Sequence, residues 1–238
     1  MNLLKLSDKE NKLIVKYLGE GAIDAYHINT SNPQYLIYTD DDGKRKISSN
    51  VGGEYTTLKE HLDKLSNYIT SSNAPYGIHR PRNKNAFTSK KIIGPSMFDS
   101  PTFAYDSNSF FVGMSYNVIT PQTTKFSLMY LLGILNSKYA KYWFWKNAKH
   151  RGVGVDVGVT KLREFPLVKN PVHQIVKDIE LNVNLIIEKL QCDIDNDIFE
   201  QTTIIDKLVY HLYGLTYDEV LIVDSNTPIT KEEYESTK

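Results

Sequence analysis

The strongest constraint on the fold is a change of sequence pattern near residue 170. Before it, short β-rich runs between residues 91 and 113 are separated by Gly, Pro, Asp, Asn and Ser. Beyond it, apolar residues recur at helical spacing over 172–190 and 202–212. The pattern predicts an α+β class, with a mixed β-sheet in residues 1–170, a helical C-terminal extension over 171–224 and a polar tail over 225–238.

The charge of the chain changes sign at the same boundary. The whole sequence carries 28 Lys and Arg and 28 Asp and Glu, so its formal net charge is zero. Residues 1–170 hold 23 of the basic and 14 of the acidic residues, whereas residues 171–238 hold 5 and 14. The first part, at +9, could therefore face a polyanion, and the remainder, at −9, could not.

Local patterns predict the individual elements. A capping box at Ser7–Glu10 precedes apolar residues at helical spacing over 13–18, which predicts a helix there. A second capping box at Thr216–Glu219 opens a short helix that ends at Val223, and the residues beyond it are expected to be frayed. The other expected elements are a strand at 35–38, a solvated turn at 40–43, a helix at 58–69, strands at 91–95, 102–105 and 110–113, and helices at 127–135 and 137–147.

No catalytic motif in the chain is complete. Asn32-Pro33-Gln34-Tyr35 resembles the Asn/Asp-Pro-Pro-aromatic motif of amino-methyltransferases, but Gln34 replaces the second proline and only 31 residues precede Asn32. The Val- and Gly-rich run at 151–158 lacks P-loop spacing and predicts a strand or loop that lies close to another backbone. The six His residues and the single Cys show no metal-ligand spacing. We expect no catalytic, cofactor-binding or metal-binding residue in this chain.

Two further features concern the compartment in which the protein works. Cys192 is the only cysteine, which excludes an internal disulfide and fits a reducing compartment. No apolar run approaches the ~20 residues that span a bilayer, and the N-terminal apolar stretch is too short for a secretory signal. These features predict a cytoplasmic protein without membrane contact.

Two stretches of the first part are rich in cations. The stretch from His79 to Lys91 has no acidic residue, and the stretch from 137 to 155 interleaves its cations with Tyr, Trp and Phe. Cations bind phosphate, arginine can also pair with guanine, and aromatic side chains stack on bases. Core aromatics and solvated lysines would give the same pattern, so nucleic-acid binding and ordinary packing both stay open. The cations are Arg80, Arg82, Lys84, Lys90, Lys91, Lys138, Lys141, Lys146, Lys149, His150 and Arg151.

An ordered series of blocks over roughly residues 5–224 is similar to a known family. The blocks are Tyr76–Arg82, Phe87 with Lys90–Pro95, Phe103–Asp106 with Phe110 and Phe111, Tyr130–Lys138, Arg151-Gly152, Leu162–Leu167 and Ile205–Thr216. In this order and spacing they resemble the TaqI-like C-terminal specificity domain of adenine-specific DNA methyltransferases. The last block also resembles the C-terminal ends of type IIG enzymes, which fuse restriction and methylation.

This resemblance implies a function and a set of site residues. Residues 1–170 would form a target-recognition domain for double-stranded DNA, and residues 171–224 would pack on the rest of the enzyme or act as a spacer. The methyltransferase that uses S-adenosylmethionine, and possibly a nuclease, would lie N-terminal to this region and outside the chain. The DNA-facing residues that the resemblance implies are Arg80, Arg82, Lys84, Lys90, Lys91, Lys149 and Arg151.

Three alternatives remain open at this point. The chain could be a stand-alone specificity subunit like those of type I systems, although such subunits usually carry two recognition domains. It could be a catalytic fragment of a nuclease or a methyltransferase, which binding of S-adenosylmethionine or Mg²⁺-dependent cleavage would reveal. It could also be a protein-interaction scaffold, which the absence of salt-sensitive DNA binding would support.

Overall fold

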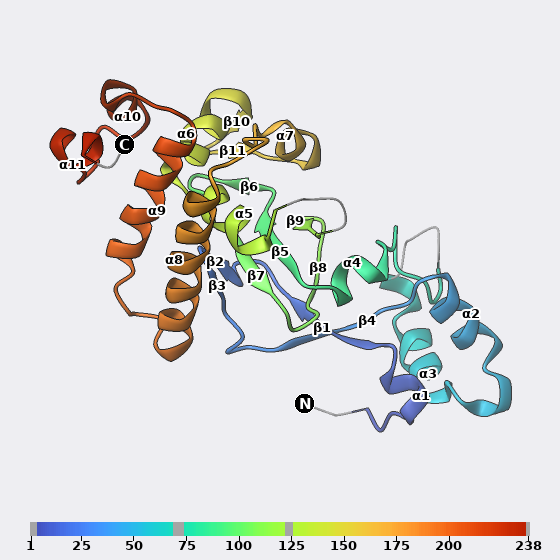
Figure 1. Cartoon of the computed structure of the whole chain (residues 1–238). Coiled ribbons are helices and arrows are strands. Elements are labelled where there is room, and N and C mark those ends of the chain that lie inside the picture. The colour runs from blue at the N-terminus through green and yellow to red at the C-terminus, as the bar shows by residue number, and fades with distance from the viewer. Residues whose placement is uncertain (1–3, 69–73, 122–125, 237–238) are drawn as a thin grey trace. The chain divides into compact units, whose positions relative to one another are not determined.

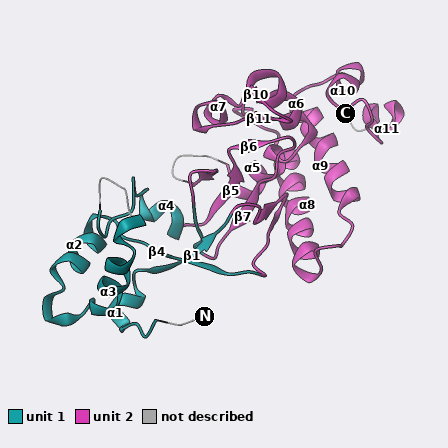
Figure 2. Ribbon diagram, turned by 180° about the vertical axis from the view of Figure 1, so that it is seen from behind, with its two compact units in different colours: residues 1–19, 32–88, 109–112 teal, residues 20–31, 89–108, 113–238 magenta. Residues whose placement is uncertain are grey.

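The computed structural model describes residues 4–68, 74–121 and 126–236. Helices and sheets of mixed strand direction are both present, which confirms the predicted α+β class (Figure 1). The chain forms two compact units, each built from several segments (Figure 2). Unit 1 comprises residues 1–19, 32–88 and 109–112, and unit 2 comprises residues 20–31, 89–108 and 113–238. The boundary expected near residue 170 therefore lies inside unit 2.

Unit 1 contains a three-stranded mixed sheet in the order β4-β1-β8. Its central strand, β1 (Ile14–Leu18), pairs antiparallel with β4 (Gln34–Ile37) and parallel with β8 (Phe111–Val112). The predicted helix over 13–18 is therefore wrong, and the helix that the capping box opens, α1 (Asp8–Asn11), ends before Lys12. The apolar spacing suits either conformation, and hydrogen bonds to two partner strands distant in sequence favour the extended one.

Helices of unit 1 pack beside this sheet on a small core. This core consists of the buried residues Leu13, Ile47, Tyr55, Leu58 and Leu62. The helices on this core are α2 (Asp41–Ser49) and α3 (Thr56–Lys64), with short 3₁₀ turns at Val51–Gly53 and Ser66–Tyr68. Unit 1 also contains α4 (Lys84–Thr88), whose Phe87 stacks on Phe111 of β8. Of the helix predicted over 58–69, residues 58–64 are helical, and residue 69 lies outside the described residues.

The acidic run after β4 begins a helix, which corrects the predicted solvated turn. A side-chain oxygen of Asp40 accepts a hydrogen bond of 3.0 Å from the amide of Gly43, which caps α2. Asp41 and Asp42 then occupy the first turn of α2, where the helix dipole favours negative charge. A run of acidic residues can thus begin a helix. One carboxylate accepts a hydrogen bond from a backbone amide that has no partner within the helix, and the others lie near the remaining amides of the first turn.

Unit 2 contains two three-stranded antiparallel sheets and a two-stranded ribbon. In the first sheet, β5 (Lys91–Pro95) lies between β7 (Ala104–Asp106) and β9 (Tyr116–Ile119). In the second, β11 (Gly154–Asp156) lies between β10 (Lys149–Arg151) and β6 (Met97–Phe98). The ribbon pairs β2 (Ile23–Asp24) with β3 (His27–Ile28). The predicted strand at 91–95 is confirmed, and those at 102–105 and 110–113 are confirmed with shifted ends.

The helices of unit 2 begin where the sequence predicts them. Ser127 and Ser137 cap α5 (Leu128–Leu135) and α6 (Lys138–Asn147), each accepting a hydrogen bond of 3.1 Å from a backbone amide three residues on. The helices that follow are α7 (Val159–Glu164), α8 (His173–Cys192) and α9 (Phe199–Leu212). Among the described residues, no helix is long and apolar enough to cross a membrane.

The C-terminal helices share one core with the sheets of unit 2. Buried residues of α8 and α9, such as Val183 and Val209, belong to the same cluster as Ile92 of β5 and Leu132 of α5. Helices α5 and α8 approach closely at Gly133, where an added Cβ would lie 2.6 Å from Cγ2 of Ile179. The predicted helical extension therefore completes the core of unit 2.

The last residues are folded, which corrects the prediction of a frayed tail. The capping box at Thr216 opens α10 (Tyr217–Val223) as expected. A further capping box at Thr230 opens α11 (Lys231–Glu235), and Tyr234 of this helix is buried. The Tyr234 ring stacks on His211 of α9 at 4.2 Å between centroids, and its hydroxyl donates a hydrogen bond of 2.7 Å to the carbonyl of Leu215. Ile229 is buried in the same cluster, so several contacts hold the polar segment on unit 2.

Candidate nucleic-acid interface

The cationic residues that the sequence points to are divided between the two units. Unit 2 brings Lys149 and Arg151 together on one strand, and it carries Lys90 and Lys91 at the start of β5. Unit 1 carries Arg80, Arg82 and Lys84 on one segment.

That segment of unit 1, residues 79–84, is held at the end of β4. The amide of Ile78 donates a hydrogen bond of 3.1 Å to the carbonyl of Thr39. The hydroxyl of Tyr38 donates a hydrogen bond to the carbonyl of Arg82. Just beyond the segment, Phe87 of α4 stacks on Phe111 of β8 at 4.6 Å between centroids. Backbone bonds and aromatic packing on both sides therefore fix the segment on unit 1.

The three cations of this segment differ in exposure. Arg80 and Lys84 are exposed, and Arg82 is half-buried. Burial lowers the pKa of the Arg82 guanidinium below its usual value. Arg80 has a φ of 53°, in the left-handed region that residues other than glycine rarely occupy, and Pro81 restricts it further. The backbone at Arg80 is thus constrained, and its side chain is exposed.

Lys91 is not available to a ligand, which corrects its prediction as a DNA-facing residue. Its side chain is fully buried, and its Nζ lies 2.5 Å from Oδ2 of Asp106, which is also fully buried. The two residues face each other across β5 and β7. The neighbouring Lys90 is exposed. Lys90 precedes β5 and stays exposed, whereas Lys91 begins this strand, whose first four residues are all buried.

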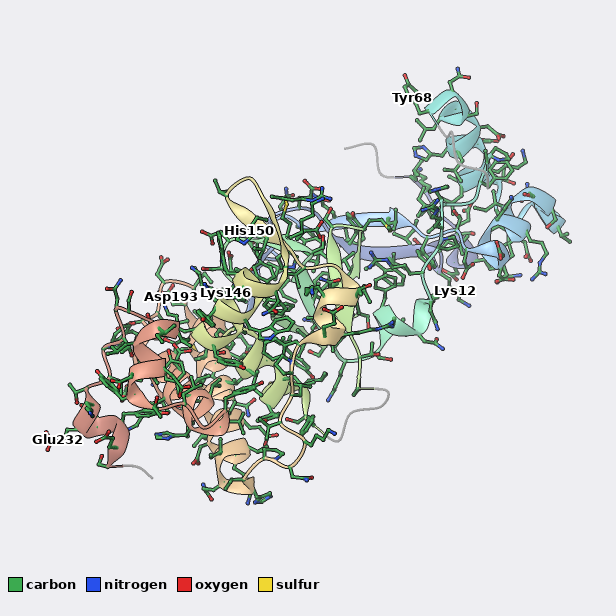
Figure 3. The ribbon with its side chains drawn as sticks, turned by 90° about the horizontal axis from the view of Figure 1, so that it is seen from above. Lys12, Tyr68, Lys146, His150, Asp193 and Glu232 are labelled. Carbon is green, nitrogen blue, oxygen red and sulfur yellow. The ribbon has the colours of Figure 1, made fainter. Side chains whose placement is uncertain are left out.

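The β10–β11 hairpin carries the other exposed cations, Lys149 and Arg151. The two residues share one face of β10, because side chains alternate along a strand. Their face also includes Asp156, which is the cross-strand partner of Lys149 and whose Oδ2 lies 3.0 Å from Nε of Arg151. On the opposite face, the His150 ring packs against Trp145 at 5.1 Å between centroids (Figure 3). The hairpin therefore turns Lys149 and Arg151 away from the aromatic side chains beneath it.

A surface pocket of about 380 Å³ adjoins this face of the hairpin. It places polar side chains that sequence reasoning missed beside Arg151, namely Glu20, Ser96 and Ser115. The Ser115 hydroxyl donates a hydrogen bond of 3.2 Å to a carboxylate oxygen of Glu20. No sequence signal could have identified this group, because its members come from four separate segments. Its donors and acceptors are of the kinds that pair with base edges.

The aromatic residues of the second basic stretch belong to the core. Phe144 is fully buried, and Tyr139 and Trp143 pack against the same cluster. The indole Nε1 of Trp145 donates a hydrogen bond of 2.7 Å to the carbonyl of Asp99. Lys141 likewise donates a hydrogen bond of 2.6 Å to the Ser100 hydroxyl. The packing interpretation of these aromatics is confirmed. The cations Lys138, Lys146, Lys149 and Arg151 of the same stretch are exposed.

Comparisons with known proteins identify a family and a similar fold. The family model described as the TaqI-like C-terminal specificity domain matches residues 16–167. Among solved structures, the Type IIL restriction-modification enzyme MmeI, determined in complex with DNA, has a similar fold, with a TM-score of 0.64 at 11% sequence identity. The similarity covers 95% of this chain and 32% of that chain, so this chain spans about a third of the length of that enzyme. No curated protein matches this chain.

Proposed function

This chain belongs to the family of TaqI-like C-terminal specificity domains, and we propose from that membership that it recognises a short sequence in double-stranded DNA. It does so as the target-recognition part of a restriction–modification enzyme. The proposal rests on the family match over residues 16–167. The structural observation that supports it is the exposed cationic face of the β10–β11 hairpin. That face joins cations, which attract phosphate, to a pocket of side chains able to pair with bases.

The exposed cations fall into two roles under this proposal. Lys84, Lys90 and Lys149 contact phosphates, because an ammonium group binds as a point charge without base discrimination. Arg80 and Arg151 are the candidates for base recognition, because a guanidinium can bind O6 and N7 of guanine together. Arg82 is half-buried and lies between Arg80 and Lys84 in the sequence. It adds positive charge to this segment and is assigned no contact of its own with DNA.

The chemistry of the parent enzyme is a further part of the proposal. A methyltransferase domain outside this chain binds S-adenosylmethionine and methylates adenine N6 in the recognised sequence, with a nuclease fused to it as in type IIG enzymes. The similarity covers about a third of a restriction–modification enzyme. This supports the proposal that DNA recognition lies in this chain and the catalytic reaction in another domain of the parent enzyme. We assign no residue of this chain to cofactor binding.

Selection from a randomised duplex pool tests the proposed function. The 238-residue chain is incubated with the pool at low and moderate salt, and the bound fraction is sequenced. Enrichment of one short motif that survives added salt is the expected result. Binding without enrichment that vanishes with salt would reduce the role of this chain to phosphate contact. No binding at either salt would favour a protein-interaction scaffold instead.

Two simple measurements separate the remaining alternatives. Titration with S-adenosylmethionine and a Mg²⁺-dependent cleavage assay on the same pool are both expected to be negative for this chain. A positive result in either would indicate a catalytic fragment. Enrichment of a two-part motif with a fixed spacer would instead indicate a stand-alone specificity subunit of the type I kind.

A further inference from the structure

The loop of the β10–β11 hairpin exposes a single apolar side chain. Arg151 pairs with Gly154, so the loop consists of Gly152 and Val153 alone. Gly152 has a φ of 55°, and a left-handed glycine at the first loop position is typical of a type II′ turn. Val153 follows at the tip with 88% of its surface exposed, the highest value among the large apolar residues described. The turn geometry therefore projects this side chain into solvent.

The hairpin beneath Val153 is rigid. Val155 and Val157 are fully buried on either side of Asp156. The amide of Val157 donates a hydrogen bond of 2.7 Å to the carbonyl of Ser96, which extends the pairing of β11 with β6. Gly154 lies so close to β6 that an added Cβ would be 2.6 Å from the carbonyl oxygen of Phe98. The tip is consequently held in place by the body of unit 2.

Charge distinguishes this exposed valine from the isolated apolar residues that are common on protein surfaces. Lys149 and Arg151 lie on the strand that leads directly to the tip. The acidic residue of the hairpin, Asp156, is ion-paired to Arg151. A polyanion attracted by this face would therefore meet Val153 at the end of the hairpin. A two-stranded ribbon also has dimensions that the major groove of B-DNA admits.

We propose that Val153 contacts the C5-methyl group of a thymine in the major groove, and thereby selects one A·T pair of the recognised sequence. The inference rests on the proposed function and names one element that reads the DNA. An apolar side chain can distinguish thymine only through this methyl group, because every other feature of that edge is a hydrogen-bond acceptor. Lys149 and Arg151 hold the hairpin in the groove through phosphate or base contacts.

The test compares selections by the whole chain and two variants from one randomised duplex pool. Val153→Ala removes the apolar tip, and Val172→Ala is the matched control, because Val172 is a 63% exposed valine of unit 2 outside the hairpin. Val153→Ala is expected to lose preference at one A·T position and to keep the others. Val172→Ala is expected to enrich the wild-type motif. Both positions are exposed, so neither change should impair folding.

Base analogues then identify the contacted atom in the enriched duplex. Deoxyuridine in place of that thymine removes only the methyl group, and should weaken wild-type binding by about fourfold, the equivalent of one buried methyl-sized group. The same replacement should leave Val153→Ala unaffected.

The outcomes separate this inference from the proposed function. An enriched motif that Val153→Ala shares in full, or wild-type binding indifferent to deoxyuridine at every position, overturns the role of Val153 and leaves DNA recognition intact. Sensitivity to inosine in place of guanine, lost in Val153→Ala, would place the tip in the minor groove and also overturn it. Absence of any enriched motif overturns both proposals.

Discussion

At the scale of single residues, the fate of a cation is decided by its neighbours in space. Lys90 and Lys91 follow each other in the sequence, yet Lys90 is exposed and Lys91 is fully buried against Asp106. Arg151 is exposed and has an ion-pair partner in Asp156. The charge pattern alone makes these three cations equivalent candidates, and the structure makes only two of them available to a ligand.

The buried pair gives a prediction about stability. Lys91→Met leaves the Asp106 carboxylate buried without its cation, so we expect a loss of about 3–5 kcal/mol in the free energy of unfolding. The double variant Lys91→Met with Asp106→Leu should recover most of that loss, because it leaves no buried charge. Urea denaturation measures both. Equal stability of the single variant and the wild type would show that the pair does not act as described.

The exposed hairpin cations give a prediction about DNA binding. Lys149→Ala should lower the slope of log K against log salt by about 0.9, because one phosphate contact is lost. Its effect should be the same on every sequence. Arg151→Ala should instead relax preference at one position of the motif, at a cost of about 1–3 kcal/mol on the preferred base. Fluorescence anisotropy over a salt series distinguishes these results, and identical behaviour of the two variants would contradict the division of roles.

At the scale of elements, several helix starts were predictable and strand pairings were not. Ser127, Ser137 and Thr216 each bond to an amide three residues on, so the signal and the structure lie within one turn of chain. Strand β1 pairs with partners about 20 and 94 residues away, Ile14 with Ile37 and Tyr17 with Phe111. Local apolar spacing therefore predicted a helix where distant partners impose a strand.

Gly154, the first residue of β11, lies against another backbone, as the sequence predicted for its Val- and Gly-rich run. Gly154→Ala would place a Cβ 2.6 Å from the Phe98 carbonyl oxygen, so β11 must shift from β6. We expect a loss of roughly 1–3 kcal/mol of stability together with weaker DNA binding, because the hairpin moves. Gly158→Ala is the control, since the nearest atom to its added Cβ is 3.9 Å away. Unchanged melting and binding in Gly154→Ala would disprove the close approach.

The junction of α9 with α6 is expected to be sensitive to pH. An Asp206 side-chain oxygen accepts a hydrogen bond of 2.8 Å from the amide of Lys138, and burial raises the pKa of Asp206 to about 7. Its pKa in the unfolded chain is about 4, so its protonated form favours folding. The stability it contributes is complete below pH ~4 and is lost as the pH rises through ~7.

A neutral replacement tests this dependence. Asp206→Asn keeps an acceptor for the amide and removes the charge, so its stability relative to the wild type should grow by roughly 1–3 kcal/mol between pH 5 and pH 8. Asp195→Asn, a change at an exposed aspartate, serves as the control. Urea midpoints across this range give the comparison, and parallel pH profiles for Asp206→Asn and the wild type would refute it.

At the scale of the whole molecule, the change of charge at residue 170 does not coincide with a change of structural unit. Both sides of that boundary belong to unit 2, and the acidic helices α8 and α9 fill its core. Apart from Asn182 and Gln201, the buried residues of these helices are apolar, and the acidic residues Glu188 and Glu200 are exposed. Charge segregation thus describes the surface of the molecule, and apolar packing defines its folding units.

Truncation after residue 170 tests this point. The fragment 1–170 lacks Ile179, Val183, Ile205 and Val209, which are buried on the cluster that includes α5. We expect it to lose cooperative unfolding, and to bind a hydrophobic dye, because the apolar face of α5 becomes exposed. Circular dichroism and urea denaturation of the fragment beside the whole chain measure this. A cooperative transition in the fragment would establish residues 1–170 as a separate domain.

The sequence by itself determined the fold class, the positions of most helices and the family, including the order of its blocks. These depend on hydrogen bonds within one turn, on periodicity and on motif spacing, all of which are written locally. Only the tertiary structure decided that Lys91 is buried, that residues 14–18 form a strand, and that Glu20 and Ser115 lie beside Arg151. The physical reason is that burial and strand pairing are set by contacts between residues far apart in the chain.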